Sequence, residues 1–540
     1  MKNNIRLTGL LLALAFFFAA CNDEFLDREP LDEVISEMYF EKPLDLEIYM
    51  NQFYTNTNFP KYPNHGGDYD FLTHYKKIEG KHEFDTYKQF VGEAYYFKAV
   101  TYFNLLKDYG DIQWLDEELG TSSPMLYMDR TSREIVADNI IACLDTAAMY
   151  LDDQKTNGYT RINKWIALLM QSRVALFEGS WQKYHQGTIF GRDGVDPNKY
   201  FQKAITASKQ VMDAGLYGLY STGDTQKDYR NLFTRRDYTN NPEVLFWRRY
   251  DNELSRGDGA FTNDRNFRMS QPLGRSMAKS MTDQYLCADG KPIAGNPLFG
   301  GYNTISEEFK NRDPRLLQTV ATPEQEWKIT AGGQVQNWSV IYNTLNTKTD
   351  LNAPTGYILQ KGYDPQVIYH VQQYEETPSI LFRYAEVLLN YIEAKAELGI
   401  ATQVDIDQTI KLLRERAGMP NLTIDAIAID PNWEFKELSP LINEIRRERH
   451  IELAAEGFRW EDIARWAAAD ELIIGKRPKG FRAAQVQTNP FPVDNQGFLD
   501  PFQKAIPAGY GFKLDRDYLD PISERELNLN ENLKQNPGWQ

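Results

Sequence analysis

The chain has 540 residues, enough for one large domain or for two to four small ones. Its net charge of −16 would repel a phosphate backbone, which argues against nucleic acid as a partner. Three cysteines are too few for a disulfide framework, so Cys143 and Cys287 are expected to be buried thiols.

The N-terminus has the pattern of an export signal. Lys2 and Arg6 precede an apolar run over 7–20, which is too short to span a bilayer. The two alanines before Cys21 resemble a bacterial lipobox, in which the cysteine is acylated and becomes the new N-terminus. We predict a lipoprotein signal peptide at 1–20 and a lipid anchor, with palmitate among its acyl chains, at Cys21. The alternative is an ordinary secretory signal that contains a cysteine.

Seven later stretches carry apolar residues at helical spacing, and six of them end in glycine, which tolerates the left-handed turn after a helix. They cover 87–110, 132–150, 163–179, 200–215, 382–399, 406–418 and 441–457. Small residues between bulky ones favour closely packed helical pairs, and the spacing is compatible with tetratricopeptide-type repeats. We predict a mostly α scaffold.

Two segments interrupt this pattern. Residues 216–380 are rich in Gly, Pro, Asn and aromatic residues, with short β-like runs at 243–250 and 355–363. Residues 471–540 are similar. We predict an N-terminal part over 21–215 and a C-terminal part over 216–540. In the latter, 216–380 would form a loop-rich, partly β ligand face, 381–470 further scaffold helices and 471–540 an irregular end.

No common catalytic or nucleotide-binding motif occurs in the sequence. His65, His74 and His82 lack the spacing of a metal site and are expected in a surface loop. Asp193 and Asp196 have a loosely Ca²⁺-like spacing with Asn198, but a turn leading into the next helix explains them better. Joined to the family resemblance described below, the absence of a catalytic motif predicts binding without catalysis, with no catalytic residue, no metal and no cofactor.

Aromatic residues in polar loops are the candidates for ligand contact, because sugars stack on aromatic faces while amides and carboxylates address hydroxyl groups. One group comprises Trp327, Trp338, Tyr342 and Asn337, and a second comprises Tyr62, Asp68, Tyr69 and Tyr75. The alternative is that these rings plug their loops into the scaffold.

Several blocks of the sequence, in order along the chain, resemble the SusD/RagB family of nutrient-binding outer-membrane lipoproteins. They are GEAYYFKAVTYFNLLKDYGDIQW (92–114), NRDPRL (311–316), TGYILQKGY (355–363), FRYAEVLLNYIEAKAELG (382–399), RERAGMP (414–420), RRERHIELAAEGFRWEDIARW (446–466) and DYLDPISERELNLNENLKQNPGW (517–539). The resemblance implies a SusD-like fold and a location at the outer membrane, facing the cell exterior. It also implies a partner, a TonB-dependent SusC-like transporter, to which captured nutrient is passed.

Three hypotheses for the function stay open. The first is a glycan-binding lipoprotein, the second is the same architecture binding peptides, as in the RagB branch, and the third is a hydrolase or a purely structural scaffold.

The blocks themselves have structural explanations. We expect Arg312 and Arg315 to clamp carboxylates or carbonyls, and Trp460 and Trp466 to belong to the core. Within the 446–466 block, Arg446, Arg447, Glu448 and Glu452 are expected to pair across helical turns.

Overall fold

The computed structural model describes most of the chain. The described residues are 42–54, 83–117, 119–154, 161–255, 263–271, 276–342, 353–486 and 491–539. The predictions for Cys21, Tyr62, Asp68, Tyr69, Tyr75 and the three clustered histidines fall outside these ranges.

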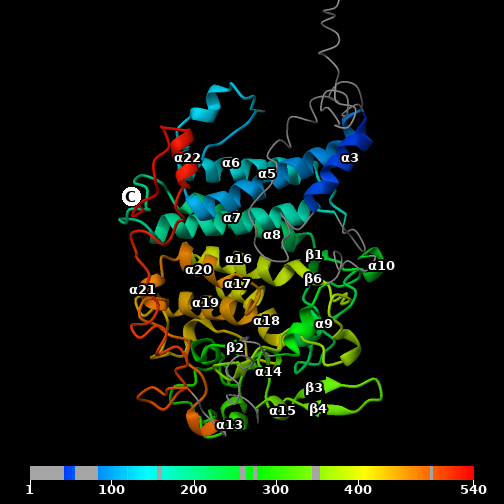
Figure 1. The fold of residues 1–540 in the computed structure, drawn as a ribbon, viewed down its shortest axis with the longest axis vertical. Helices are drawn as coiled ribbons and strands as arrows, with labels where there is room; N and C mark the ends of the chain where they lie inside the picture. Colours follow the sequence, from blue (N-terminus) through cyan, green and yellow to red (C-terminus); the bar gives the residue numbers. More distant parts are fainter. Residues whose placement is uncertain are drawn as a thin grey trace, which may run out of the picture.

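A stack of long helices forms the scaffold (Figure 1). It consists of α3 (Pro43–Asn51), α5 (Lys88–Tyr109), α6 (Arg133–Tyr150), α7 (Lys164–Tyr184), α8 (Asn198–Asp213), α16 (Tyr384–Glu397) and α19 (Pro440–Glu452). Helix α5 packs on α6, α6 on α7 and α7 on α8, and α16 then packs on α8 although it lies far away in the sequence. The fold is mostly helical, as predicted, and it is organised as packed helical pairs.

Shorter helices lie among the remaining described residues, some of them below the stack in Figure 1 and others beside it. They are α9 (Asp228–Thr234), α10 (Asn252–Ser255), α11 (Arg265–Met269), α12 (Lys279–Thr282), α13 (Ile305–Phe309), α14 (Pro314–Thr319), α15 (Ser339–Tyr342), α17 (Gln403–Asp407), α18 (Ile410–Arg416), α20 (Arg459–Arg465), α21 (Ala469–Leu472) and α22 (Glu524–Leu529). None of the helices in the described part of the chain is long and apolar enough to cross a membrane.

Three small antiparallel sheets of two strands each complete the described structure. They pair β1 (Val244–Arg248) with β6 (Ser379–Arg383), β2 (Ser276–Met277) with β5 (Tyr357–Ile358), and β3 (Glu326–Ile329) with β4 (Val335–Asn337). In the first sheet Phe246 lies opposite Phe382 and Trp247 opposite Ile380. Because β6 leads directly into α16, this sheet joins the irregular part of the molecule to the helical stack.

The glycines that end the predicted helices have two different roles. Gly110 and Gly215 follow α5 and α8 with φ of 73° and 63°, which confirms the predicted left-handed ends. At Gly179 the prediction is wrong, because α7 continues to Tyr184. A Cβ atom there would lie 3.0 Å from the Phe201 ring, so this glycine instead allows α7 and α8 to pack closely.

Two other predicted helices are interrupted. The 406–418 pattern is split into α17 and α18, because Thr409 has a non-helical backbone with φ of −133° and ψ of −86°. The 441–457 pattern ends at Glu452, and left-handed residues follow at Ala455 and Gly457, with φ of 61° and 95°. Periodicity alone therefore overestimated the length of both helices.

The cores follow this arrangement. One large apolar cluster lies among α5, α6, α7 and α16, and a separate cluster in the irregular part contains Trp338, Tyr357 and Phe481. Cys143 and Cys287 are buried and form no disulfide, as predicted. Asp196 accepts the backbone N–H of Asn198 at 3.0 Å in the turn that leads into α8.

Candidate functional site

The charged residues of the family-like blocks meet in a buried ionic network. Helix α19 lies at its centre and is buried on all sides, since Arg446, Arg447, Glu448 and Glu452 are each less than 5% exposed. The prediction that these four pair across turns of their own helix holds for Arg447, which lies 3.2 Å from Glu444, and is wrong for the other three. Other segments enclose α19, and most of the ionic partners come from those segments, as for Arg446 with Glu397 at 3.2 Å.

Glu452 is the most connected carboxylate in this network. It lies 3.0 Å from Arg315, 2.8 Å from Arg383 and 2.6 Å from Arg416. Burial would raise the pKa of Glu452, but the three guanidinium groups outweigh burial and hold that pKa well below its ordinary value. The blocks at 311–316, 382–399 and 414–420 are thereby fastened to α19.

The two arginines of the 311–316 block clamp their surroundings, as predicted. Arg312 donates to the backbone carbonyls of Thr282 and Tyr285 at 2.8 and 2.7 Å. Arg315 donates to Asp313 at 2.8 Å and to Glu448 at 2.6 Å. Their role is structural.

The two tryptophans of the 446–466 block have different positions. Trp466 is 3% exposed and donates its indole N–H to Glu393 at 2.9 Å, which confirms the core prediction. Trp460 is 48% exposed, so its assignment to the core is wrong. It lies in the first turn of α20, with its ring centroid 6.1 Å from that of Phe512.

The turn after α19 directs Glu456 back toward the network. Its carboxylate accepts hydrogen bonds from Arg383 at 2.7 Å and from Lys361 at 2.6 Å. Lys361 also donates to the Ala454 carbonyl at 2.8 Å. Burial lowers the pKa of Lys361 to about 8, although the Glu456 carboxylate acts in the opposite direction. This turn forms one wall of a large cavity.

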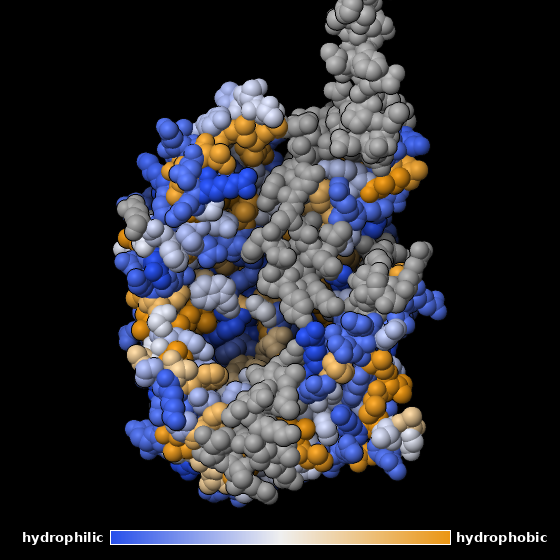
Figure 2. Space-filling view, viewed as in Figure 1, coloured by the Kyte–Doolittle hydropathy of each residue, from blue (hydrophilic) through white to orange (hydrophobic). Residues whose placement is uncertain are grey.

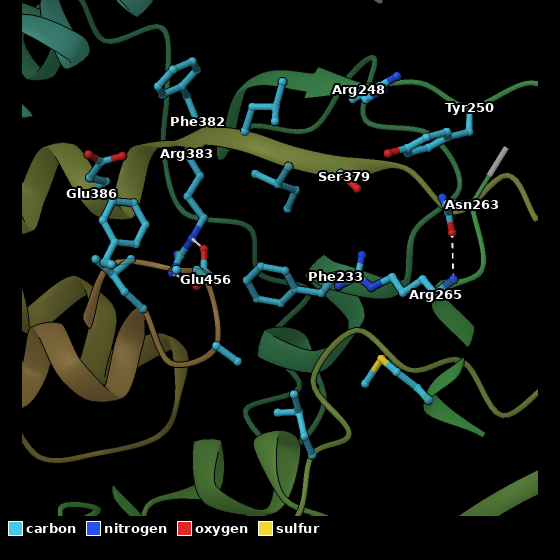
Figure 3. Close-up of a pocket in the computed structure, with 18 of the residues that line it drawn as sticks. Phe233, Arg248, Tyr250, Asn263, Arg265, Ser379, Phe382, Arg383, Glu386 and Glu456 are labelled. Atoms are coloured by element: carbon cyan, nitrogen blue, oxygen red, sulfur yellow. Dashed lines mark hydrogen bonds and ion pairs between the residues drawn. The ribbon is translucent and has the colours of Figure 1, made fainter. Parts of the chain in front are cut away.

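The cavity has a volume of about 730 Å³ and lies between the helical stack and the irregular part. Its walls come from α7, α11, β6, the end of β1 and the segment 453–461. Figure 3 shows Arg265 extending along the cavity toward Phe233, with Tyr250 and Ser379 on the opposite wall. The face seen in Figure 2 is hollowed near mid-height, with hydrophilic residues inside the hollow. Pockets of this size accommodate small organic ligands.

The charges on the cavity wall are unevenly compensated. Its five arginines are Arg173, Arg248, Arg265, Arg268 and Arg383, and four carboxylates accompany them. Arg173 forms a bidentate pair with Glu386 at 2.6 and 2.7 Å. Arg265 donates instead to the Pro378 carbonyl at 3.3 Å. The wall therefore offers polar donors beside the rings of Phe233 and Tyr250.

A smaller groove of about 430 Å³ shares Tyr250 with the cavity. Tyr374 at its edge is 52% exposed, and Ile368 beside it is 58% exposed. The Arg236 guanidinium lies 3.5 Å from the centre of the Tyr369 ring, which fixes that ring in place. The cavity and the groove are both lined by rings and polar groups, and Tyr250 belongs to both linings.

The first predicted aromatic group does not form an exposed platform. Trp338 is 0% exposed and Tyr342 is buried, with its hydroxyl donating to the Ala321 carbonyl at 2.6 Å. Trp327 is half-buried and donates its indole N–H to the Ser270 carbonyl at 3.1 Å. Asn337 alone is exposed. These rings anchor the β3–β4 hairpin to the second core, so the expectation of a surface platform at Trp338 and Tyr342 is corrected.

Four residues of these hollows were not predicted from the sequence: Arg265, Tyr250, Tyr369 and Tyr374. They occur in irregular segments with no periodicity, and their proximity depends on the pairing of β1 with β6. The one available signal was Tyr250, the last residue of the β-like run at 243–250.

Comparison with known proteins gives consistent similarities. A family model described as the SusD family matches residues 242–539. SusD-like protein P2 of Formosa agariphila is 25% identical over 456 residues, which cover 83% of this chain and 73% of that protein.

Solved structures with the same fold include a SusD-like carbohydrate-binding protein from Bacteroides fragilis. It has a TM-score of 0.63 at 21% identity and covers 94% of this chain and 87% of its own. A laminarin-binding SusD-like protein has a TM-score of 0.50 at 19% identity, with coverages of 87% and 83%. The fold of most of this chain is thus shared with these proteins.

Proposed function

The chain belongs to the SusD family, whose model matches more than half of its length, and from this premise we propose that it is a cell-surface lipoprotein that binds oligosaccharides. Captured glycan is delivered to a TonB-dependent, SusC-like transporter in the outer membrane. The anchor is Cys21, and the outer membrane is reached through it alone. The similar structures named for carbohydrate and laminarin binding support the ligand class.

The observation that carries this proposal is that the cavity and the groove lie side by side, with Tyr250 lining both. We propose that a bound oligosaccharide contacts both hollows. Tyr369 and Tyr374 offer ring faces for pyranose stacking, and the arginines and Ser379 offer partners for hydroxyl groups.

The carboxylates of the cavity favour binding without chemistry. A glycosidase needs a general acid with a raised pKa. Burial would raise the pKa of Glu456, but Arg383 and Lys361 outweigh it, so the pKa is lowered. In the same way Lys107 and Arg173 lower the pKa of Glu461 against the effect of burial. Neither group is suited to donate a proton at neutral pH.

The test is affinity electrophoresis followed by calorimetry on the full chain, in a detergent without a sugar headgroup. The panel contains neutral and acidic polysaccharides, their oligosaccharides and peptides. We expect one glycan class to bind, and we expect Tyr369→Ala and Tyr374→Ala each to weaken binding about 10-fold.

Tyr127→Ala is the matched control, because Tyr127 is 56% exposed and lines neither hollow. It should leave the affinity unchanged. If peptides bind and no glycan does, the glycan-binding proposal is contradicted and the peptide-binding alternative is supported. Hydrolysis of a bound oligosaccharide would contradict the proposal that the protein does no chemistry.

The transporter partnership needs its own measurement. Co-purification of the chain with a TonB-dependent transporter from membranes of the native cell would support it, and recovery of the chain without such a partner would contradict it. Replacement of Cys21 by Ser should release the chain from the membrane fraction, whereas an ordinary secretory signal would leave the fractionation unchanged.

A further inference from the structure

The cavity wall carries an arginine that has no ionic partner in the described part of the chain. Arg265 lies on α11, and its guanidinium donates through Nη1 to the Pro378 carbonyl at 3.3 Å. None of its N–H groups donates to a carboxylate of the described residues. The side chain is half-buried, so its charge is only partly solvated.

Every carboxylate on the same wall already has a cation. Asp264 pairs with Arg268 at 3.2 Å and Glu386 with Arg173 at 2.6 Å. Glu461 pairs with Lys107 at 2.5 Å, and Glu456 is held by both Arg383 and Lys361. The acidic residues of the cavity are thus compensated within the protein, whereas Arg265 is not. This local excess of positive charge occurs in a chain whose net charge is −16.

The backbone is shaped to hold Arg265 in this position. Gly362 has φ of 77°, and a Cβ atom there would lie 1.9 Å from Arg265 Nη2. The guanidinium therefore lies directly against the Gly362 main chain, where any side chain would displace it. In Figure 3 the Arg265 side chain runs along the cavity, with Ser379 and the Tyr250 ring facing it from the other wall. A fixed, planar guanidinium matches the two oxygens of a carboxylate or sulfate.

We infer that the sugar taken by this cavity bears an acidic substituent, a carboxylate or a sulfate ester, and that Arg265 binds it. The anionic group of the ligand would form the ion pair that Arg265 does not form with any carboxylate of the described residues. This inference rests on the proposed glycan-binding function and specifies its ligand class. Attraction to the anion would compete with water and salt ions, so the affinity should fall as ionic strength rises.

Two matched ligand pairs test the inference by calorimetry on the full chain, in the same detergent. One pair is tetragalacturonate and its neutral methyl ester, and the other is a sulfated tetrasaccharide and its desulfated form. At least one acidic member should bind 10-fold or more tightly than its neutral counterpart. The pair that shows the difference identifies the substituent.

Variants locate the effect. Arg265→Gln should abolish the preference for the acidic member while leaving weak binding of the neutral one. Arg265→Lys keeps the charge but loses the planar fork, and it should retain part of the preference. Arg235→Gln removes a charge from an exposed arginine outside both hollows and should change nothing. Circular dichroism confirms that each variant is folded.

The outcomes separate this inference from the proposed function. If glycans bind but acidic and neutral members bind equally, or if Arg265→Gln leaves the preference intact, the inference is overturned and the function stands. If no glycan in either panel binds, the proposed function fails and the inference fails with it.

Discussion

Arg383 holds Glu452 at two points, with one hydrogen bond to its carboxylate and another to its backbone carbonyl, both at 2.8 Å. Arg383 is the last residue of β6 and Glu452 the last residue of α19. This pair therefore ties the sheet beside the cavity to the most enclosed helix of the fold. The position of the cavity wall depends on it.

Glu452→Gln should destabilise the protein strongly. The substitution removes the charge that compensates Arg315, Arg383 and Arg416 in the interior, and breaking a buried ion pair costs about 3–5 kcal/mol. Urea unfolding followed by circular dichroism measures the loss. Glu415→Gln is the control, since its pair with Lys411 at 3.7 Å is exposed and contributes about 1 kcal/mol or less. If the two substitutions lower stability equally, the buried ion pairs of Glu452 do not contribute more than an exposed pair, and the prediction is contradicted.

Gly179→Ala should also destabilise, although alanine favours helices by about 1 kcal/mol over glycine. The new methyl group would meet the Phe201 ring at 3.0 Å and push α8 away from α7, which typically costs about 1–3 kcal/mol. Thermal unfolding measures the net effect of the gain in helix propensity and the steric cost. Thr206→Ala on the exposed face of α8 provides a control without a steric conflict. An increase in stability at Gly179 would show that the two helices are not closely packed there.

Stability should fall between pH 6.5 and 4, in part through His185. This ring is buried, stacked on Trp181 at 4.0 Å, and bonded through Nε2 to the Ala464 carbonyl at 2.8 Å. Burial lowers the pKa of His185 from 6.5 to about 4, partly opposed by that carbonyl. The unfolded chain therefore binds the proton first, so the stabilisation is complete above pH 6.5 and is lost toward pH 4.

At pH 5, protonation of His185 in the unfolded chain lowers the free energy of unfolding by roughly 2 kcal/mol relative to its value above pH 6.5. Other groups titrate in the same window, so the measurement is the difference between the parent and His185→Gln, taken as melting temperature at several pH values. The variant should lose less stability than the parent on acidification. Parallel curves would exclude His185 as a source of the pH dependence.

Substitutions at Trp338 should lower the stability of the protein without changing its affinity for ligand. It is fully buried, with its ring centroid 5.4 Å from that of Tyr363, and truncating it to alanine should cost about 3–5 kcal/mol. Its indole N–H has no hydrogen-bond acceptor among the described residues, so Trp338→Phe should cost much less. Chemical unfolding compares the two variants. Loss of glycan affinity in a folded Trp338→Phe protein would contradict this prediction and would indicate that Trp338 contacts the ligand.

Much of the scaffold could be predicted from the sequence because its signals are local. Helical spacing of apolar residues located α5, α6, α8 and α16 to within a few residues, and the glycine after α5 correctly marked that helix's end. Gly179 shows where local patterns fail. The sequence displays the same glycine whether it ends a helix or makes room for Phe201 of another one.

The candidate site could not be predicted in this way. Trp338 and Trp460 occur in similarly polar surroundings in the sequence, yet one is fully buried and the other is half exposed. Burial is decided by what packs against a side chain, and those partners come from distant segments. Arg265 likewise becomes a candidate ligand contact only because Gly362 and Pro378, about 100 residues away, are placed beside it.

The sequence by itself determined the class of fold, the family resemblance and the acidic character of the chain. Tertiary structure decided which arginines of the cavity wall pair with carboxylates and that Arg265 pairs with none in the described part of the chain. The physical reason is that a charge's partners, like a ring's exposure, are set by contacts between segments that helical spacing and turn chemistry leave unspecified.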